Sequence, residues 1–289
     1  MDTMPDGDAT IDYGARIVTM IERRSVVGLV NAIHAFYRIG ALEPILTASP
    51  NAVAQWVAEG AQKPVVNGPT LDALRVPARK VTVTVPYSVE FLRLTHARVD
   101  LAVNADMTHA LRVAEDSAFC DAAPGDAARP ASIFYEHVIT GTGDPQTDFA
   151  ALIARIPEEY LADVVLLLNA ADCVALLTAG LADNQTLSVA SGGLVAGLPA
   201  VVSGGVPRGA IGWCVPRLIA LVDEGSRITS SDEATLEMTD GTLVSLWESD
   251  LAALRGERWI AWAPLANNVA GMMTGVLASN LAPTKRAKA

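Results

Sequence analysis

The fold is decided by the stretch Arg79-Lys80-Val81-Thr82-Val83-Thr84-Val85-Pro86-Tyr87-Ser88-Val89-Glu90-Phe91-Leu92. Apolar and polar residues alternate strictly from Val81 to Val85, which predicts a half-buried β-strand. The period changes after Pro86, where Ser88 suits the N-cap of a helical turn. A longer helix is then predicted from about Val99 to Cys120, on the order of 30 Å long. Its predicted core stripe consists of small and apolar residues at spacings of three and four: Val103, Met107, Leu111, Ala114 and Ala118.

Upstream of the strand, the sequence predicts an extended hairpin from about Ala54 to Val85. Asn67-Gly68 is a strong turn signal, because both residue types tolerate positive φ. The outer part of the hairpin, from Gln62 to Lys80, carries too few apolar residues for a core of its own. A two-stranded ribbon is only marginally stable in water unless one face packs on something. We therefore expect this hairpin to rest on another molecule.

The remainder of the chain alternates between helical and extended patterns. Residues 1–50 are predicted to form an arm. Within it, Ile17 to Ile21 is a possible strand, and the apolar run from Val26 to Ile33 fits either a helix or a strand. Helices are predicted from Phe149 to Leu161 and from Ala170 to Thr178. Strands are predicted at Val164–Leu168, within Leu194–Val202, at Leu218–Val222, and within Leu243–Leu254 and Trp259–Trp262. Helices interspersed with late strands that return to a sheet indicate an α+β or mixed architecture.

Composition and charge exclude several classes of protein. The 289 residues carry a net charge of -11, which argues against a nucleic-acid-binding surface built on clustered Lys and Arg. The three cysteines form no CxxC pair and the four histidines share no ligand spacing, so no metal site or disulfide framework is predicted. The two long uncharged stretches contain several Gly, Pro and Asn residues, so we expect buried strands there and no membrane span.

The chain carries no complete catalytic motif. Gly192 to Gly197 has the glycine spacing of a phosphate-binding loop, but Leu198-Pro199 stands where such a loop has Lys-Ser/Thr. Gly141-Thr142-Gly143 lacks the third glycine of a dinucleotide-binding loop. We therefore expect neither an enzyme nor a cofactor. A soluble α/β enzyme that uses the Gly192–Gly197 loop is kept as an alternative, because catalytic groups assemble in space rather than in sequence.

Five segments, in this order along the chain, resemble a known family: Trp56-Val57-Ala58-Glu59-Gly60-Ala61-Gln62-Lys63-Pro64, Arg79 to Leu92, Ala114-Glu115-Asp116-Ser117-Ala118-Phe119, Leu198-Pro199-Ala200-Val201-Val202, and Ser245 to Arg255. They look like the major capsid proteins of tailed bacteriophages, which have the Hong Kong 97-like fold. In that family a segment similar to the first opens an extended loop, and an alternating strand returns to a long "spine" helix.

The resemblance implies an α+β fold with four parts. These are an N-terminal arm (1–50), an extended loop (51–87), a peripheral domain that holds the spine helix (88–150 and 225–289), and an axial domain (151–224). It implies that the extended loop contacts neighbouring subunits through Trp56, Glu59, Lys63, Asp72, Arg75, Arg79 and Lys80.

The resemblance also implies a function. The protein is expected to self-assemble through hexamers and pentamers into an icosahedral shell around double-stranded phage DNA, without sequence-specific binding. It is expected in the virion after assembly in the host cytoplasm, with a portal protein as a partner. A separate scaffolding protein is expected because the residues before Trp56 show no long charged helix. An encapsulin-like nanocompartment shell is the alternative within the same fold.

Overall fold

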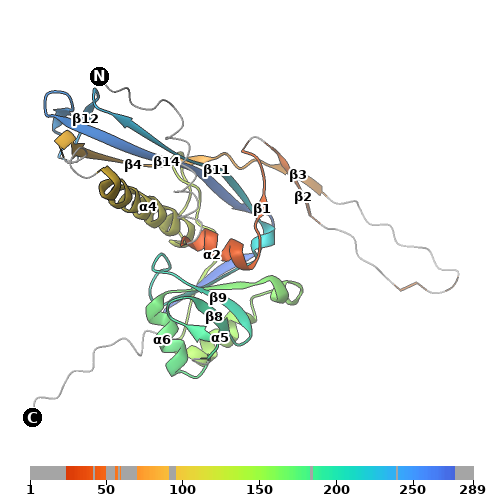
Figure 1. The fold of residues 1–289 in the computed structure, drawn as a ribbon. Coiled ribbons are helices and arrows are strands. Elements are labelled where there is room, and N and C mark those ends of the chain that lie inside the picture. The colour runs from red at the N-terminus through yellow and green to blue at the C-terminus, as the bar shows by residue number, and fades with distance from the viewer. Residues whose placement is uncertain are drawn as a thin grey trace, which may run out of the picture.

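The structure is a computed structural model that describes residues 24–276, apart from 42, 50–55, 58, 60–69, 91–95, 183–184 and 239. Two sheets form the framework of the described chain (Figure 1). The first has four strands in the order β1-β11-β14-β4, and the second has seven in the order β5-β15-β10-β6-β9-β8-β7. A long helix, α4 (His96–Cys120), lies along the first sheet, and two shorter helices flank the second (Figure 1).

The four-stranded sheet is built on two long antiparallel strands, β11 (Ile219–Ser231) and β14 (Leu251–Pro264). The alternating stretch identified in the sequence forms β4 (Arg79–Ser88), which is antiparallel to β14 from the Leu251–Ser88 pair to the Ile260–Arg79 pair. The short strand β1 (Tyr37–Arg38) joins the opposite edge, parallel to β11. Alternation in β4 therefore reflects one face turned toward α4 and one turned away.

Helix α4 has 25 residues and is therefore about 38 Å long. Val103 and Met107 are buried against side chains of β4 and β14, and Leu111 is buried against Val81, Val83 and Ile228. A Cβ atom on Gly256 of β14 would lie 3.0 Å from the Met107 methyl carbon. The absence of a side chain at this glycine lets the helix approach the sheet closely.

The seven-stranded sheet packs against α5 (Pro145–Ile153) and α6 (Ala170–Thr178) through Phe149, Leu152, Cys173 and Leu176. Its two central strands, β6 and β10, are buried along their whole length. The strands are β5 (Val138–Thr140), β6 (Val165–Leu168), β7 (Leu187–Ser188), β8 (Gly192–Val195), β9 (Leu198–Val202), β10 (Ala210–Cys214) and β15 (Ala270–Thr274). Short 3-10 helices cover Glu158–Asp163 and Pro216–Leu218.

One short helix, α2 (Val26–Ile33), connects the two halves of the molecule. It contacts α4 on one side and β9 on the other, and it buries Val26, Val27 and Val30. These valines belong to the same apolar cluster as Phe119 of α4 and Leu166 of β6. The main core is therefore continuous between the two sheets.

Two expectations about the extended hairpin were wrong in detail. The hairpin consists of β2 (Ile45–Ser49) and β3 (Thr70–Leu74), so it begins before residue 51. The alternating strand is not its return arm, because β4 pairs with β14 instead. The reason is that the apolar face of β4 needs α4 as a cover, and an isolated ribbon offers none.

The two sheets also divide the chain differently from the expected domain boundaries. β5 and β15, expected in the peripheral domain, join the seven-stranded sheet. β11 starts at Ile219 and belongs to the four-stranded sheet, although residues up to 224 were expected in the axial domain. The expected helix from Phe149 to Leu161 is α5 followed by a separate 3-10 turn. The possible strand from Ile17 to Ile21 lies outside the described residues.

Among the described helices, none combines the length and the apolar character that crossing a membrane requires.

Candidate assembly surfaces

The β2–β3 hairpin projects from the body of the protein (Figure 1). Within the described chain, its two strands pair only with each other. Its base is anchored, because Ile45 and Leu74 pack against a small cluster that contains Val76, Ala220 and Val222. One position further out, Leu46 is 67% exposed. Successive side chains of a strand point to opposite faces, so at its base the hairpin packs one face on the body and presents apolar surface on the other.

The residues expected to make contacts between subunits lie in three different settings. Trp56, Glu59 and Arg75 are exposed. Asp72 lies on β3, opposite Thr47, and Arg79 starts β4. Lys63 lies outside the described residues. Lys80 forms an ion pair of 3.2 Å with Glu257 on the adjacent strand, so it already has a carboxylate partner within its own chain.

The expected stripe of the long helix is only partly apolar. Val103, Met107 and Leu111 are buried and Ala118 packs beside the main core, but Ala114 is exposed. The next two residues, Glu115 and Asp116, are buried in its place. The correction has a physical reason: the two carboxylates accept hydrogen bonds from Arg258 of β14 and Val26 of α2, and an apolar pattern search cannot register such partners.

Arg258 holds the first of these carboxylates. Its side chain is 1% exposed, its Nε donates to Glu115 over 2.7 Å, and its Nη2 donates to Asp223 over 3.1 Å. Burial raises the pKa of Glu115, and the nearby Arg258 charge opposes that rise. Within the described residues, Glu115 Oε1 and Arg258 Nη1 have no hydrogen-bond partner. Glu115, Arg258 and Asp223 thus form an ion triad, which joins the long helix to the two central strands of its sheet.

Asp116 joins the long helix to α2. Its Oδ1 accepts a 2.6 Å hydrogen bond from the backbone N–H of Val26, at the first residue of α2, and Arg112 lies 3.4 Å from its Oδ2. A carboxylate is favourable there because the N-terminus of a helix carries unpaired N–H groups and partial positive charge. Burial raises the pKa of Asp116 to about 7, and the neighbouring Glu115 charge adds to this.

The two glycine segments have structural roles in the described chain. Gly192 to Gly197 spans β8 and the turn into β9, where Ala196 (φ 50°) and Gly197 (φ 85°) close an antiparallel hairpin. The strand β9 follows this segment, and a helix does not, so the phosphate-loop geometry of the enzyme alternative is not formed. In the other segment, Gly141-Thr142-Gly143, the N–H groups of Thr142 and Gly143 donate hydrogen bonds to the buried carboxylate of Asp148. No cluster of three or more His, Cys, Asp or Glu suited to a metal ion occurs among the described residues.

A long helix on a four-stranded sheet, a second sheet flanked by helices, and a projecting hairpin together define the Hong Kong 97-like fold. Solved structures from Mycobacterium phage Ogopogo (TM-score 0.64, 17% identity, 87% of this chain and 92% of that one) and Gordonia phage Cozz (TM-score 0.63, 15% identity, 87% and 86%) share this fold. So does the capsid of an empty GTA particle computed with C5 symmetry (TM-score 0.62, 10% identity, 85% and 89%).

The phage capsid family model matches residues 12–268, and the chain belongs to that family. The "Capsid polyprotein" of Pseudomonas phage PAJU2 is 28% identical over 303 residues. That alignment covers 93% of this chain and 44% of the relative, so the chain spans less than half of the relative's length.

Proposed function

We propose that this protein is the major capsid protein of a tailed phage and that its subunits assemble into a closed icosahedral shell. Membership in the phage capsid family supports a structural role, and neither the encapsulin-like alternative nor the enzyme alternative is favoured by the comparisons. The observation that carries the proposal is the β2–β3 hairpin, which is anchored at its base and has no partner further out among the described residues.

The hairpin suits a contact with a second subunit. A free two-stranded ribbon is marginally stable, and its exposed edges invite pairing with other chains. The exposed Leu46, Trp56 and Val57 supply apolar surface that a neighbouring subunit would bury. Burial of one such large side chain contributes about 1.5–3 kcal/mol, and a shell repeats the contact in every subunit.

The finer parts of the proposal concern partners. Hexamers and pentamers would build the shell, and a portal protein and a separate scaffolding protein would take part in assembly. The shell would enclose double-stranded DNA without reading its sequence. A subunit with a net charge of -11 repels the DNA phosphates, whereas tight DNA binding needs clustered Lys and Arg. The protein would act in the virion, after assembly in the host cytoplasm, and would need no catalytic group or cofactor.

The test removes the outer hairpin and keeps its base. Ser49 and Thr70 are paired opposite each other, so an Asn-Gly turn placed between them would close the ribbon directly. The shortened protein is expected to keep the melting temperature of the free wild-type subunit but to form no closed shells in negative-stain microscopy. The matched control places the same Asn-Gly turn at Ala196-Gly197, between β8 and β9, and is expected to form shells as wild type does. Closed shells from the shortened protein would refute the role of the hairpin, and a wild-type protein that stays monomeric at high concentration would refute the shell function.

A further inference from the structure

The far end of the four-stranded sheet carries a small tip that contains β12 (Figure 1). Here the tip means residues 232–250, which include the paired strands β12 (Thr235–Glu237) and β13 (Leu243–Ser245). Trp247 is 77% exposed and Leu243 is 70% exposed, whereas Leu246 beside them is fully buried. The buried leucine anchors the tip, so the exposed tryptophan is held on an ordered base.

The tip is strongly acidic. It contains no Lys or Arg and six carboxylates: Asp232, Glu233, Glu237, Asp240, Glu248 and Asp250. Two tips placed face to face would bring twelve like charges together while burying their tryptophans, which is unfavourable. The complementary surface is therefore one that combines an apolar floor with positive charge.

Such a surface lies at the opposite end of the same sheet. A groove of about 270 Å³ has a floor of Val76, Pro77, Ala261 and Trp262 and carries three arginines, Arg75, Arg79 and Arg129. Asp121 holds Arg129 through two 2.8 Å hydrogen bonds, and Asp126 lines the groove together with Arg79. Arg75 is exposed and forms no ion pair within the described chain. The groove therefore keeps a net positive charge.

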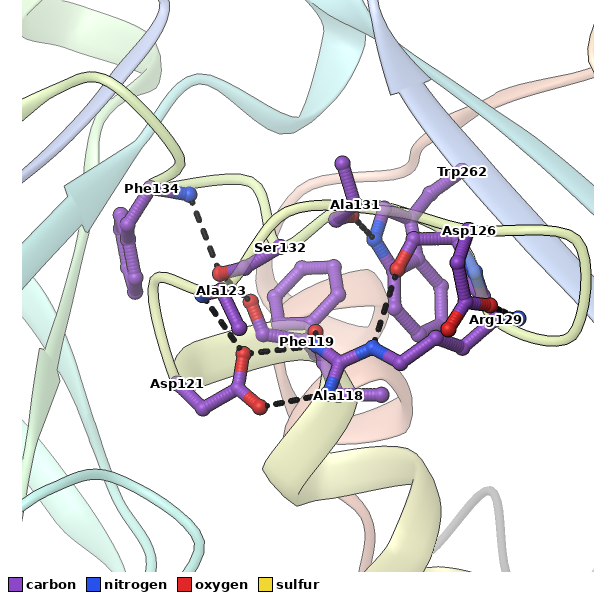
Figure 2. A network of polar contacts seen from close by, with 11 residues as sticks. Ala118, Phe119, Asp121, Ala123, Asp126, Arg129, Ala131, Ser132, Phe134 and Trp262 are labelled. Atoms are coloured by element: carbon purple, nitrogen blue, oxygen red, sulfur yellow. Dashed lines mark hydrogen bonds and ion pairs between the residues drawn. The ribbon is translucent and has the colours of Figure 1, made fainter.

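A network of polar contacts around Arg129 and Trp262 supports one side of the groove (Figure 2). Trp262 Nε1 donates to the carbonyl of Ala131 over 2.8 Å, and its ring packs edge-on against Phe119 with centroids 5.0 Å apart. The Asp126 carboxylate accepts from the backbone N–H groups of Ala128 and Arg129 and so holds the loop that forms one wall. A preformed surface loses little entropy on binding.

A single chain cannot bring its tip into its own groove. The strand β14 runs from Leu251, beside the tip, to Trp262 in the groove floor. Eleven strand residues at roughly 3.3 Å each separate the two by about 36 Å. Any contact between tip and groove must therefore join two molecules.

We propose that the acidic tip of one copy docks into the arginine-lined groove of a second copy, with Trp247 packed on the apolar floor and Glu248 near Arg75. Aromatic and arginine side chains are the residue types that dominate interface energies, and the flanking charges orient the two partners. The contact is head-to-tail, so it generates rings or chains of subunits rather than isolated pairs. This inference rests on the proposed shell function and names one contact through which it would be achieved.

The test is disulfide cross-linking of assembled protein. A variant with both P77C and E248C keeps Trp247 and all three groove arginines and places one thiol on each surface, and the three native cysteines are buried. Mild oxidation is expected to give a ladder of dimers, trimers and larger species on non-reducing gels, because each chain carries both halves of a head-to-tail contact. The matched control, V174C with E248C, moves one thiol to an exposed position on α6 and is expected to give at least tenfold less cross-linked product.

Three outcomes separate the possibilities. A ladder confined to the P77C/E248C variant supports the docking. Shells that form normally, with no more cross-linking than in the control or with dimers from E248C alone, overturn the docking but leave the shell function standing. Wild-type protein that forms no oligomer under the same conditions overturns the shell function and the docking with it.

Discussion

Replacing Arg258 by methionine removes the centre of the buried ion triad and leaves Glu115 without its positive partner. Glu115 is 2% exposed, and Arg258 is the group that opposes the rise in its pKa. Breaking a buried pair by removing one member costs about 3–5 kcal/mol, because the remaining charge stays buried without compensation. For a chain of this size, each kcal/mol lowers the melting temperature by about 2–4 °C. The R258M variant is therefore expected to melt about 6–20 °C below wild type.

The assay is urea denaturation of the free subunit at pH 7.5 and pH 5.5. Loss of Arg258 raises the pKa of Glu115 further, so the folded variant takes up a proton that the unfolded chain, with its ordinary carboxyl pKa, binds only at lower pH. The difference in free energy of unfolding between wild type and R258M should therefore shrink as the pH falls. The E115Q/R258M double variant should recover part of the lost stability, because the buried Glu115 charge is gone and only the less buried Asp223 is left without Arg258.

Arg255 on the same strand supplies the matched control. Its side chain is 53% exposed and lies 3.5 Å from Glu257. Exposed ion pairs contribute about 0–1 kcal/mol, so R255M should be nearly neutral. If R258M proved as stable as R255M at both pH values, the triad would not hold the long helix to its sheet, and the argument from burial would be wrong.

Three further predictions concern the long helix. M107A should lower the free energy of unfolding by about 2–5 kcal/mol, because Met107 is fully buried; a loss below 1 kcal/mol in urea titrations would contradict the packing on β4 and β14. A110P should cost about 3 kcal/mol or more, since proline removes a hydrogen bond in mid-helix, and an unchanged melting curve would contradict the helix bounds. Asp116, with its pKa raised to about 7, is protonated in the folded protein over a range where the unfolded chain is ionised. Wild type should therefore lose stability relative to D116N as pH rises from about 4 to 7, by at most about 1.4 kcal/mol per unit, and parallel pH profiles would refute this.

Local patterns in the sequence predicted several elements well. The alternation from Val81 to Val85 lies within β4, and the helix expected from Ala170 to Thr178 has those bounds in the structure. The long helix was predicted to end at Cys120 and does so, although it starts at His96. These features depend on side-chain periods of two and 3.6 residues and on local caps such as Asn169, which act within a few residues of each other. The order of the five motifs along the chain was then sufficient to predict the family.

Tertiary structure alone decided which segments meet. The sequence could not show that β4 pairs with β14 rather than with the hairpin, because both edges offer the same backbone hydrogen bonds. Nor could it show that Glu115 and Asp116 are buried while Ala114 is exposed, because the partners Arg258 and Val26 lie far away in the chain. The acidic tip and the arginine-lined groove became recognisable as complementary surfaces only when β14 placed them at opposite ends of one sheet. Burial and charge pairing depend on which residues meet in the folded protein. The sequence shows each residue of such a pair but does not show its partner.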